Sequence, residues 1–140
     1  MQRHHLRKAF GRPIGKFEGT QFIIAEDHTL IEAVRMLAYR TLWMKDEGMT
    51  RELPKWIAMA KWYGVHASLK TIDDAITLHA AVAYTTEYPL EYLYRATKGL
   101  DIGDSTPQIM KMIIARELLG REFCHIGDGK IDALKIAVRN

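Results

Sequence analysis

Apolar side chains recur every three, four or seven positions over two long stretches of the chain. The first runs from residue 20 to about residue 45 without Gly or Pro, with apolar positions at Phe22, Ile23, Leu30, Ile31, Val34, Leu37, Ala38, Leu42 and Trp43. The second begins near Pro54 and includes Ile57, Ala58, Trp62, Val65, Ser68, Leu69, Ile72, Ala75, Ile76, His79 and Val82. This spacing is typical of amphipathic helices. It predicts two helices of about 25–30 residues, each roughly 40 Å long.

Gly and Pro divide the rest of the chain into shorter elements. Pro89 is placed to open a helix that runs to about Lys98, and residues 99–105 are expected to form a loop. Pro107 lies in the first turn of a last predicted helix, which Gly120 ends.

Two long helices joined by a short loop should lie antiparallel, and two shorter ones can complete the fold. We therefore expect residues 1–120 to form an all-α, antiparallel four-helix up-and-down bundle. Residues 121–140 should form a C-terminal tail with a short helix. The apolar stripes are wider than a lone bundle needs, so we expect a homo-oligomer, a dimer or a tetramer, that buries a second face.

Composition narrows the class of protein. A chain of 140 residues with 48% hydrophobic and 26% charged residues is typical of one globular domain. The net charge of +3 is too small to indicate a nucleic-acid partner, and no apolar run is long enough for a membrane span. The lone Cys124 excludes an internal disulfide and favours a reducing compartment, so we expect the cytoplasm.

A helical bundle raises the question of a metal site. Di-iron bundles use Glu-x-x-His on two helices, but this chain has a single such pair, Glu122 and His125, between two glycines. We therefore expect no metal. Cys124 has no Cys partner and no evident base, which favours an inert thiol over a nucleophile.

Three segments carry a more specific pattern. Residues 7–15 spell Arg-x-x-Phe-Gly-x-Pro-Ile-Gly, residues 84–91 spell Tyr-x-x-Glu-Tyr-Pro-x-Glu, and residues 113–120 spell Ile-Ile-Ala-Arg-Glu-Leu-Leu-Gly. In this order and spacing they resemble the C-terminal helical domain of acyl-CoA dehydrogenases, from about residue 3 to Gly120. The resemblance implies the helical bundle expected above. It also makes the basic N-terminus part of the domain rather than a transit peptide, which composition alone leaves open.

The resemblance implies oxidation of the CH–CH bond of acyl-CoA thioesters. In the family a carboxylate removes the α-proton and FAD accepts the β-hydrogen as hydride. That carboxylate is often the Glu of a Tyr-Glu-Gly-Thr motif, and Gly103-Asp104-Ser105-Thr106 stands in its place here. Asp104 is therefore the candidate base, although Asp is one methylene shorter. Two alternatives remain open: Asp104 is only a helix-capping acid beside Thr106, or the base lies upstream of residue 3, as in some members.

The resemblance also implies residues that contact FAD. Arg7 and Phe10 match residues that meet the FAD of a neighbouring subunit in the family. Thr106 and Gln108 match a Thr-x-Gln that touches FAD in some members.

Other positions depart from the family pattern. Glu18 stands where a Gln usually lies near the diphosphate, Thr77 stands for another Gln, and Ala80-Ala81 stands for Gly-Gly. Ala96 replaces an Asp. A carboxylate repels phosphate, and two methyl groups crowd a backbone that approaches the cofactor closely. These departures indicate a weakened FAD half-site.

Two functions follow as hypotheses. The chain is the C-terminal part of an acyl-CoA dehydrogenase, as a fragment or as a split or degenerate subunit. A separate partner would then supply the N-terminal and middle domains, and acyl-CoA and an electron-transfer flavoprotein would bind only the completed enzyme. The alternative is a non-catalytic helical oligomerisation module that has lost its FAD site.

Overall fold

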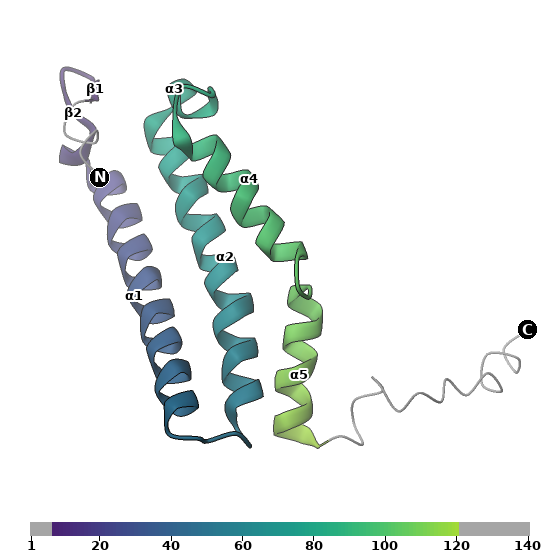
Figure 1. Cartoon of the computed structure of the whole chain (residues 1–140). Coiled ribbons are helices and arrows are strands. Elements are labelled where there is room, and N and C mark those ends of the chain that lie inside the picture. Colours follow the sequence, from purple (N-terminus) through teal and green to yellow (C-terminus); the bar gives the residue numbers. More distant parts are fainter. Residues whose placement is uncertain (1–6, 121–140) are drawn as a thin grey trace, which may run out of the picture.

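The computed structural model describes residues 7–120, and these fold almost entirely as helices (Figure 1). The elements are β1 (Lys8–Ala9), β2 (Arg12–Pro13), a 3₁₀ turn η2 (Ile14–Lys16), α1 (Glu18–Asp46), α2 (Leu53–His79), α3 (Ala81–Tyr84), α4 (Pro89–Ile102) and α5 (Pro107–Leu119). The predicted all-α class is confirmed. The predicted tail helix lies outside the described residues.

Helix α2 is the centre of the molecule. It packs against α1 on one side and against α4 and α5 on the other. Figure 1 shows α4 and α5 following one another along α2, so that together they form a third column. Both α1 and this third column run antiparallel to α2, as expected for an up-and-down arrangement.

The contact between α1 and α2 follows one regular row of side chains on α1. Its members alternate at spacings of four and three, and all are buried or half-buried: Ile23, Asp27, Leu30, Val34, Leu37, Thr41 and Met44. We call this row the inner stripe. Such spacing is typical of helices that pack nearly antiparallel with interlocking side chains. On α2, a Cβ added at Gly64 would lie 3.4 Å from Cγ1 of Val34, so glycine permits the close approach there.

Two predicted boundaries are wrong. Helix α2 ends at His79 rather than near Val82, because Ala80 adopts a φ of 57° and turns the chain into α3. Helix α4 continues through Gly99 to Ile102, where a loop was expected. A glycine inside a helix costs only about 1 kcal/mol relative to alanine, so neighbouring contacts outweigh it.

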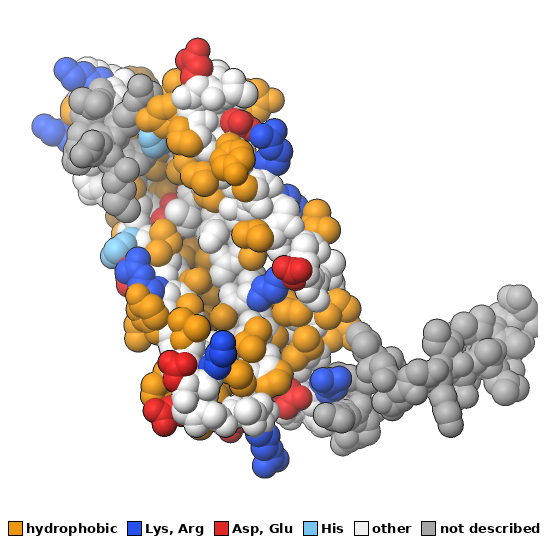
Figure 2. Space-filling view, in the orientation of Figure 1, with side chains coloured by type: hydrophobic (Ala, Val, Ile, Leu, Met, Phe, Trp, Pro, Cys, Tyr) orange, Lys and Arg blue, Asp and Glu red, His pale blue; other side chains and the backbone are white. Residues whose placement is uncertain are grey.

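Few side chains of the described residues are fully enclosed. The buried hydrophobic ones are Ile14, Met44, Ala58, Ala67, Ala83 and Met110. Phe22, Leu42 and Trp43 belong to the predicted stripe of the first helix, yet they are 62%, 56% and 50% exposed. The predicted stripe therefore merged two faces of α1. Figure 2 shows hydrophobic side chains spread among charged ones over the visible face.

No helix within residues 7–120 is long and apolar enough to cross a bilayer. The described part of the chain is instead a single layer of helices with much apolar surface left uncovered.

Candidate functional site

The first candidate residues lie on a short hairpin before α1. Strands β1 and β2 pair antiparallel, with Lys8 opposite Pro13, and the Ile14 N–H donates to the Arg7 carbonyl at 2.9 Å. The Arg7 guanidinium donates a hydrogen bond to the carbonyl of Leu78 in the last turn of α2. A cation is favoured there because the carbonyls at a helix C-terminus are unpaired and carry partial negative charge.

Phe10 lies at the tip of this hairpin. Phe10 and Gly11 both have positive φ, 49° and 76°, as a tight two-residue turn requires. The Phe10 side chain is 94% exposed and makes an edge-to-face contact with Phe17, with ring centroids 6.3 Å apart. The turn thus presents an aromatic ring outward rather than into the fold.

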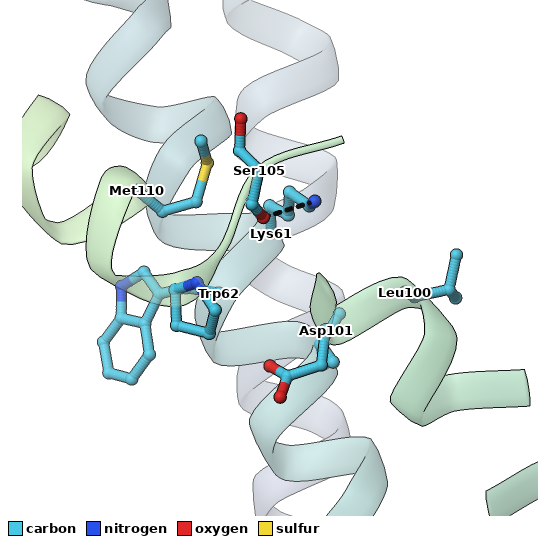
Figure 3. A pocket seen from close by; sticks show the side chains of 8 residues that line it. Lys61, Trp62, Leu100, Asp101, Ser105 and Met110 are labelled. Atoms are coloured by element: carbon cyan, nitrogen blue, oxygen red, sulfur yellow. Dashed lines mark hydrogen bonds between the residues drawn. The ribbon is translucent and has the colours of Figure 1, made fainter. Parts of the chain in front are cut away.

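The second group of candidates lies at the junction of α4 and α5 (Figure 3). Lys61 of α2 donates hydrogen bonds to the carbonyls of Gly103 and Ser105, the latter at 3.0 Å. These two carbonyls flank Asp104 in the chain. Lys61 therefore clamps both sides of the candidate base to the central helix.

The junction backbone is strained where Lys61 holds it. Asp104 has a φ of 59° and Ser105 a φ of 134°, both in the region that favours glycine. Non-glycine residues in such conformations cluster at functional sites, where surrounding contacts hold them. Asp104 is exposed, and it makes no hydrogen bond or ion pair with the rest of residues 7–120.

The capping alternative for Asp104 gains no support from this geometry. Thr106 is the N-cap of α5, yet no side chain completes the cap. Thr106 is half-buried and Gln108 is exposed at the start of the same helix. Asp104, Thr106 and Gln108 thus lie close together in the chain around this junction, and the exposed Asp104 and Gln108 carry polar groups available to a ligand.

A small hollow lies at this junction (Figure 3). Lys61, Trp62, Asp101 and Met110 are among its lining residues, and it leaves no room for a water molecule. Cofactor pockets are usually several hundred Å³ in volume. Any flavin here would therefore lie on the surface of this domain and need walls from elsewhere.

The two groups of candidate residues are far apart. Arg7 contacts Leu78 in the last turn of α2, while Lys61, which holds the backbone on either side of Asp104, lies in the first third of that helix. The 1.5 Å rise per residue separates Lys61 and Leu78 by about 26 Å along the helix. Arg7 therefore lies near the C-terminal end of α2, far from the junction that carries Thr106 and Gln108.

The positions that match the family pattern and those that depart from it differ in how well they suit FAD. Arg7, Thr106 and Gln108 carry N–H or O–H donors suited to a polar cofactor. Glu18, the first residue of α1, places a carboxylate where a phosphate would be repelled. Ala80 and Ser105 stand where the family has glycine, and both keep a glycine-like positive φ. At these two positions the backbone therefore adopts a conformation that favours glycine, although the residues carry a Cβ.

A polar cluster interrupts the inner stripe between α1 and α2. Lys70 donates to Asp27 at 3.3 Å and to Asp74 at 2.5 Å, and Thr71 donates to Asp27 at 3.4 Å. Burial raises the pKa of the Asp27 carboxyl above its usual value, and the hydrogen bond from Lys70 only partly opposes this. The Lys70 pKa is raised, chiefly by its hydrogen bond to Asp74.

Among residues 7–120, no three His, Cys, Asp or Glu side chains gather as metal ligands would. Glu122, Cys124 and His125 lie outside the described residues.

Lys61 is the functional candidate that sequence patterns alone did not single out. It lies three residues after Ala58 and four before Val65, so it falls on the apolar face of α2. A lysine on a buried helix face needs a hydrogen-bond or ion-pair partner. This requirement is the feature of the sequence that could have identified Lys61. The identity of that partner, 42 residues further along the chain, needed the structure.

The sequence of this chain is similar to proteins of a known family. Residues 1–119 match the family model described as acyl-CoA dehydrogenase, C-terminal domain. The 3-(aryl)acrylate reductase of Clostridium sporogenes is 33% identical over 113 residues, which is 81% of this chain but 29% of that relative.

Solved structures agree with the sequence match. A glutaryl-coenzyme A dehydrogenase in complex with glutaryl-CoA superposes with a TM-score of 0.77 and 36% identity, over 84% of this chain and 30% of that one. An FAD complex of PigA superposes with a TM-score of 0.78 and 28% identity, with the same coverages. The chain therefore spans less than a third of the relatives it matches.

Proposed function

Because this chain belongs to the acyl-CoA dehydrogenase family, as its C-terminal domain, we propose that it supplies the helical part of a flavin-dependent enzyme that oxidises the CH–CH bond of acyl-CoA thioesters. The other two-thirds of such an enzyme come from the same polypeptide or from a separate subunit. The single observation that carries this proposal is the Asp104 junction, which Lys61 holds in a strained, outward-facing conformation.

In this proposal Asp104 is the base. Its carboxylate takes the α-proton of the thioester, which is weakly acidic and requires a closely placed base. Thr106 and Gln108 would hold FAD beside this carboxylate, where the flavin would supply a hydride acceptor for the β-hydrogen, with an electron-transfer flavoprotein as the final electron acceptor. Asp104 is exposed in this domain. The remaining domains would therefore have to exclude water from it, which strengthens a base by desolvation.

The flavin contacts divide between two sites. Thr106 and Gln108 lie beside Asp104 and would contact the flavin that reacts there. Arg7 and Phe10 lie about 26 Å away along α2, so they would contact the FAD of a neighbouring copy. Arg7 already donates to Leu78, but a guanidinium has five N–H donors and keeps several for a ligand.

The first test is a visible absorbance titration of the purified chain with FAD, followed by a sizing column that reads mass and flavin together. A surviving half-site predicts flavin that elutes with an oligomer. The Arg7→Ala variant should bind flavin less tightly, while Lys8→Ala, an exposed basic neighbour, should match the parent. Equal binding by both variants would remove Arg7 from the site.

The second test concerns the reaction itself. The pure chain should not reduce a dye with acyl-CoA and FAD, because the pocket walls lie in other domains. In a complex reconstituted with those domains, Asp104→Asn should abolish turnover with FAD still bound. Unchanged turnover would exclude Asp104 as the base.

A non-catalytic oligomerisation module is the second candidate function. Glu18, Thr77, Ala80 and Ala81 favour it, and Ala80 keeps a strained φ of 57° that glycine would relieve. This function predicts a flavin-free homo-oligomer in the same experiment. In either case we place the chain in the cytoplasm, since its lone cysteine suits a reducing compartment.

A further inference from the structure

The turn between α4 and α5 is held at each end by a helix. The Gly103 N–H donates to the Gly99 carbonyl at 2.8 Å, at the end of α4, and the Thr106 carbonyl accepts an N–H bond from α5 at 3.1 Å. The remaining hydrogen bonds to this turn from within residues 7–120 come from Lys61 of α2. The shape of the turn between its two helices therefore depends on one side chain.

Lys61 holds the peptide groups that lie on either side of the two strained residues. Its ammonium donates to the Gly103 carbonyl, in the peptide group before Asp104, and at 3.0 Å to the Ser105 carbonyl, in the peptide group after Ser105. Figure 3 shows the Lys61 side chain directed at the Ser105 backbone, with this bond as a dashed line. Asp104 and Ser105, with φ values of 59° and 134°, thus lie between two fixed points. Without this support their favoured conformations would have negative φ, where a Cβ is not crowded.

The direction of the Asp104 side chain depends on this backbone conformation. Because φ is the rotation about the N–Cα bond, a return to negative φ would swing the Cβ and the carboxylate around that bond. An aspartate side chain has one rotatable bond fewer than a glutamate, so it has little freedom to compensate. A displacement of about 1 Å between a base and its substrate costs on the order of a hundredfold in rate. The backbone that Lys61 holds therefore sets where the base can act.

Lys61 uses its charge on this turn and not on an acidic side chain. No carboxylate among residues 7–120 forms an ion pair with its ammonium, so its hydrogen bonds there go to carbonyls. Gly103 makes room for this arrangement, since a Cβ there would lie 3.1 Å from the Gly99 carbonyl oxygen and crowd the end of α4. A lysine on the central helix and a glycine in the turn together keep Asp104 in one orientation.

We propose that Lys61 is a positioning residue for proton removal: by holding the Gly103 and Ser105 carbonyls, it fixes the direction of the Asp104 carboxylate. The inference rests on the proposed function, in which Asp104 is the base. In this role Lys61 acts through the backbone and transfers no proton. Its loss should therefore lower the rate of the chemical step and leave the binding of acyl-CoA and FAD unchanged.

Steady-state kinetics of the completed enzyme, this chain together with the N-terminal and middle domains, test this role. Lys61→Met keeps an unbranched side chain and removes its donors. It should lower kcat by on the order of a hundredfold, with KM and FAD content unchanged. Lys61→Arg keeps a cationic donor and should recover part of the loss.

Lys111→Met is the matched control. The exposed Lys111 lies over the Trp62 ring, 4.5 Å from its centroid, and Trp62 lines the same hollow as Lys61. This variant also removes a lysine next to the junction, but Lys111 makes no hydrogen bond to the turn within residues 7–120. It should leave kcat unchanged.

A longer base separates positioning from general stabilisation. Asp104→Glu adds a CH₂ group and a rotatable bond, so its carboxylate depends less on the backbone direction. Lys61→Met should therefore reduce kcat by a smaller factor in the Asp104→Glu background than in the parent. A merely structural role of Lys61 would give the same factor in both backgrounds, because stability does not depend on the reach of this carboxylate.

NMR of the chain alone tests the contact without turnover. Couplings and short-range NOEs between N–H and Hα report the φ of each residue. The parent should show positive φ at Asp104 and Ser105. Lys61→Met should shift both residues toward negative φ, and Lys61→Arg should stay close to the parent.

Several results would overturn the proposal. These are an unchanged kcat in Lys61→Met, a loss by the same factor in both backgrounds, or an unchanged φ at Asp104 without Lys61. A raised KM with unchanged kcat would overturn it too, since Lys61 would then serve substrate binding. Turnover retained by Asp104→Asn would instead remove the base and with it the proposed function, while the NMR result would still decide whether Lys61 fixes Asp104. Failure of the inference is thus distinct from failure of the proposed function.

Discussion

The α1–α2 contact and the α4–α5 junction are held by different kinds of interaction. The first is a long row of evenly spaced side chains, with Met44 fully enclosed and Gly64 allowing close approach. The second is a four-residue turn with two strained backbone positions, held by the single side chain of Lys61. The packing between α1 and α2 holds the long helices together, and the strained turn exposes the Asp104 carboxylate. Each region can be broken separately.

Removing packing from the inner stripe should have the largest effect. Met44→Ala should lower the free energy of unfolding by about 2–5 kcal/mol, because the side chain is completely buried and leaves a cavity. Denaturant unfolding measures the change. Met49→Ala, at a position 40% exposed, should cost much less. Similar losses in the two variants would show that the α1–α2 contact is not the main stabilising region.

Removing the Lys61 hydrogen bonds should destabilise the α4–α5 junction more than the α1–α2 contact. Lys61→Met leaves the carbonyls of Gly103 and Ser105 without their charged donor, and it should cost about 1–3 kcal/mol. Hydrogen exchange should speed up at the Gly103 N–H, which bonds to Gly99 at 2.8 Å, and stay unchanged around Met44.

Lys61→Arg should restore much of this protection, since it keeps a cationic donor. Lys45→Met, at an exposed position on α1, is the control and should not alter exchange at the junction. Uniform acceleration across all helices in Lys61→Met would mean that Lys61 supports the whole fold rather than this turn.

The scaffold could be predicted from the sequence because its signals are local and repeated. Apolar spacing placed both long helices, and Pro107 and Gly120 marked the ends of the last one. Gly99 misled the prediction for α4, because side-chain contacts along α2 outweigh the small cost of one helical glycine. The predicted burial of Phe22 and Trp43 was wrong as well, because in sequence a helix with two apolar faces resembles a helix with one wide apolar face.

The junction could be predicted only in part. The family pattern pointed to Asp104, Thr106 and Gln108, which lie within five residues of one another around the α4–α5 junction. It did not reveal the Lys61 clamp, which joins positions 42 residues apart. The family pattern assigned Arg7 to the FAD of a neighbouring subunit, but its distance from the junction, about 26 Å along α2, needed the structure.

Strain at the junction and at the end of α2 can be relieved by glycine. Ala80→Gly and Ser105→Gly should each raise the free energy of unfolding by about 0.5–1 kcal/mol, because positive φ is costly for side chains with a Cβ and free for glycine. Ala75→Gly, inside α2, should lower it by about 1 kcal/mol. Thermal unfolding of the three variants decides this. Destabilisation by all three would show that the positive φ values at Ala80 and Ser105 carry no strain.

The smallest effect should come from the polar break in the inner stripe, and it should depend on pH. Burial raises the pKa of Asp27 in the folded protein above its ordinary value of 3.8, so the ionised carboxylate opposes folding. This penalty is absent below pH 3.8, grows as the pH rises from the unfolded to the folded pKa, and is complete above the folded pKa. Asp27→Asn should therefore stabilise the fold at pH 7 and lose that advantage at about pH 3. Asp73→Asn, at an exposed position beside the cluster, should show no such trend. A gain for Asp27→Asn that is the same at both pH values would mean that packing, and not charge, sets the cost of this residue.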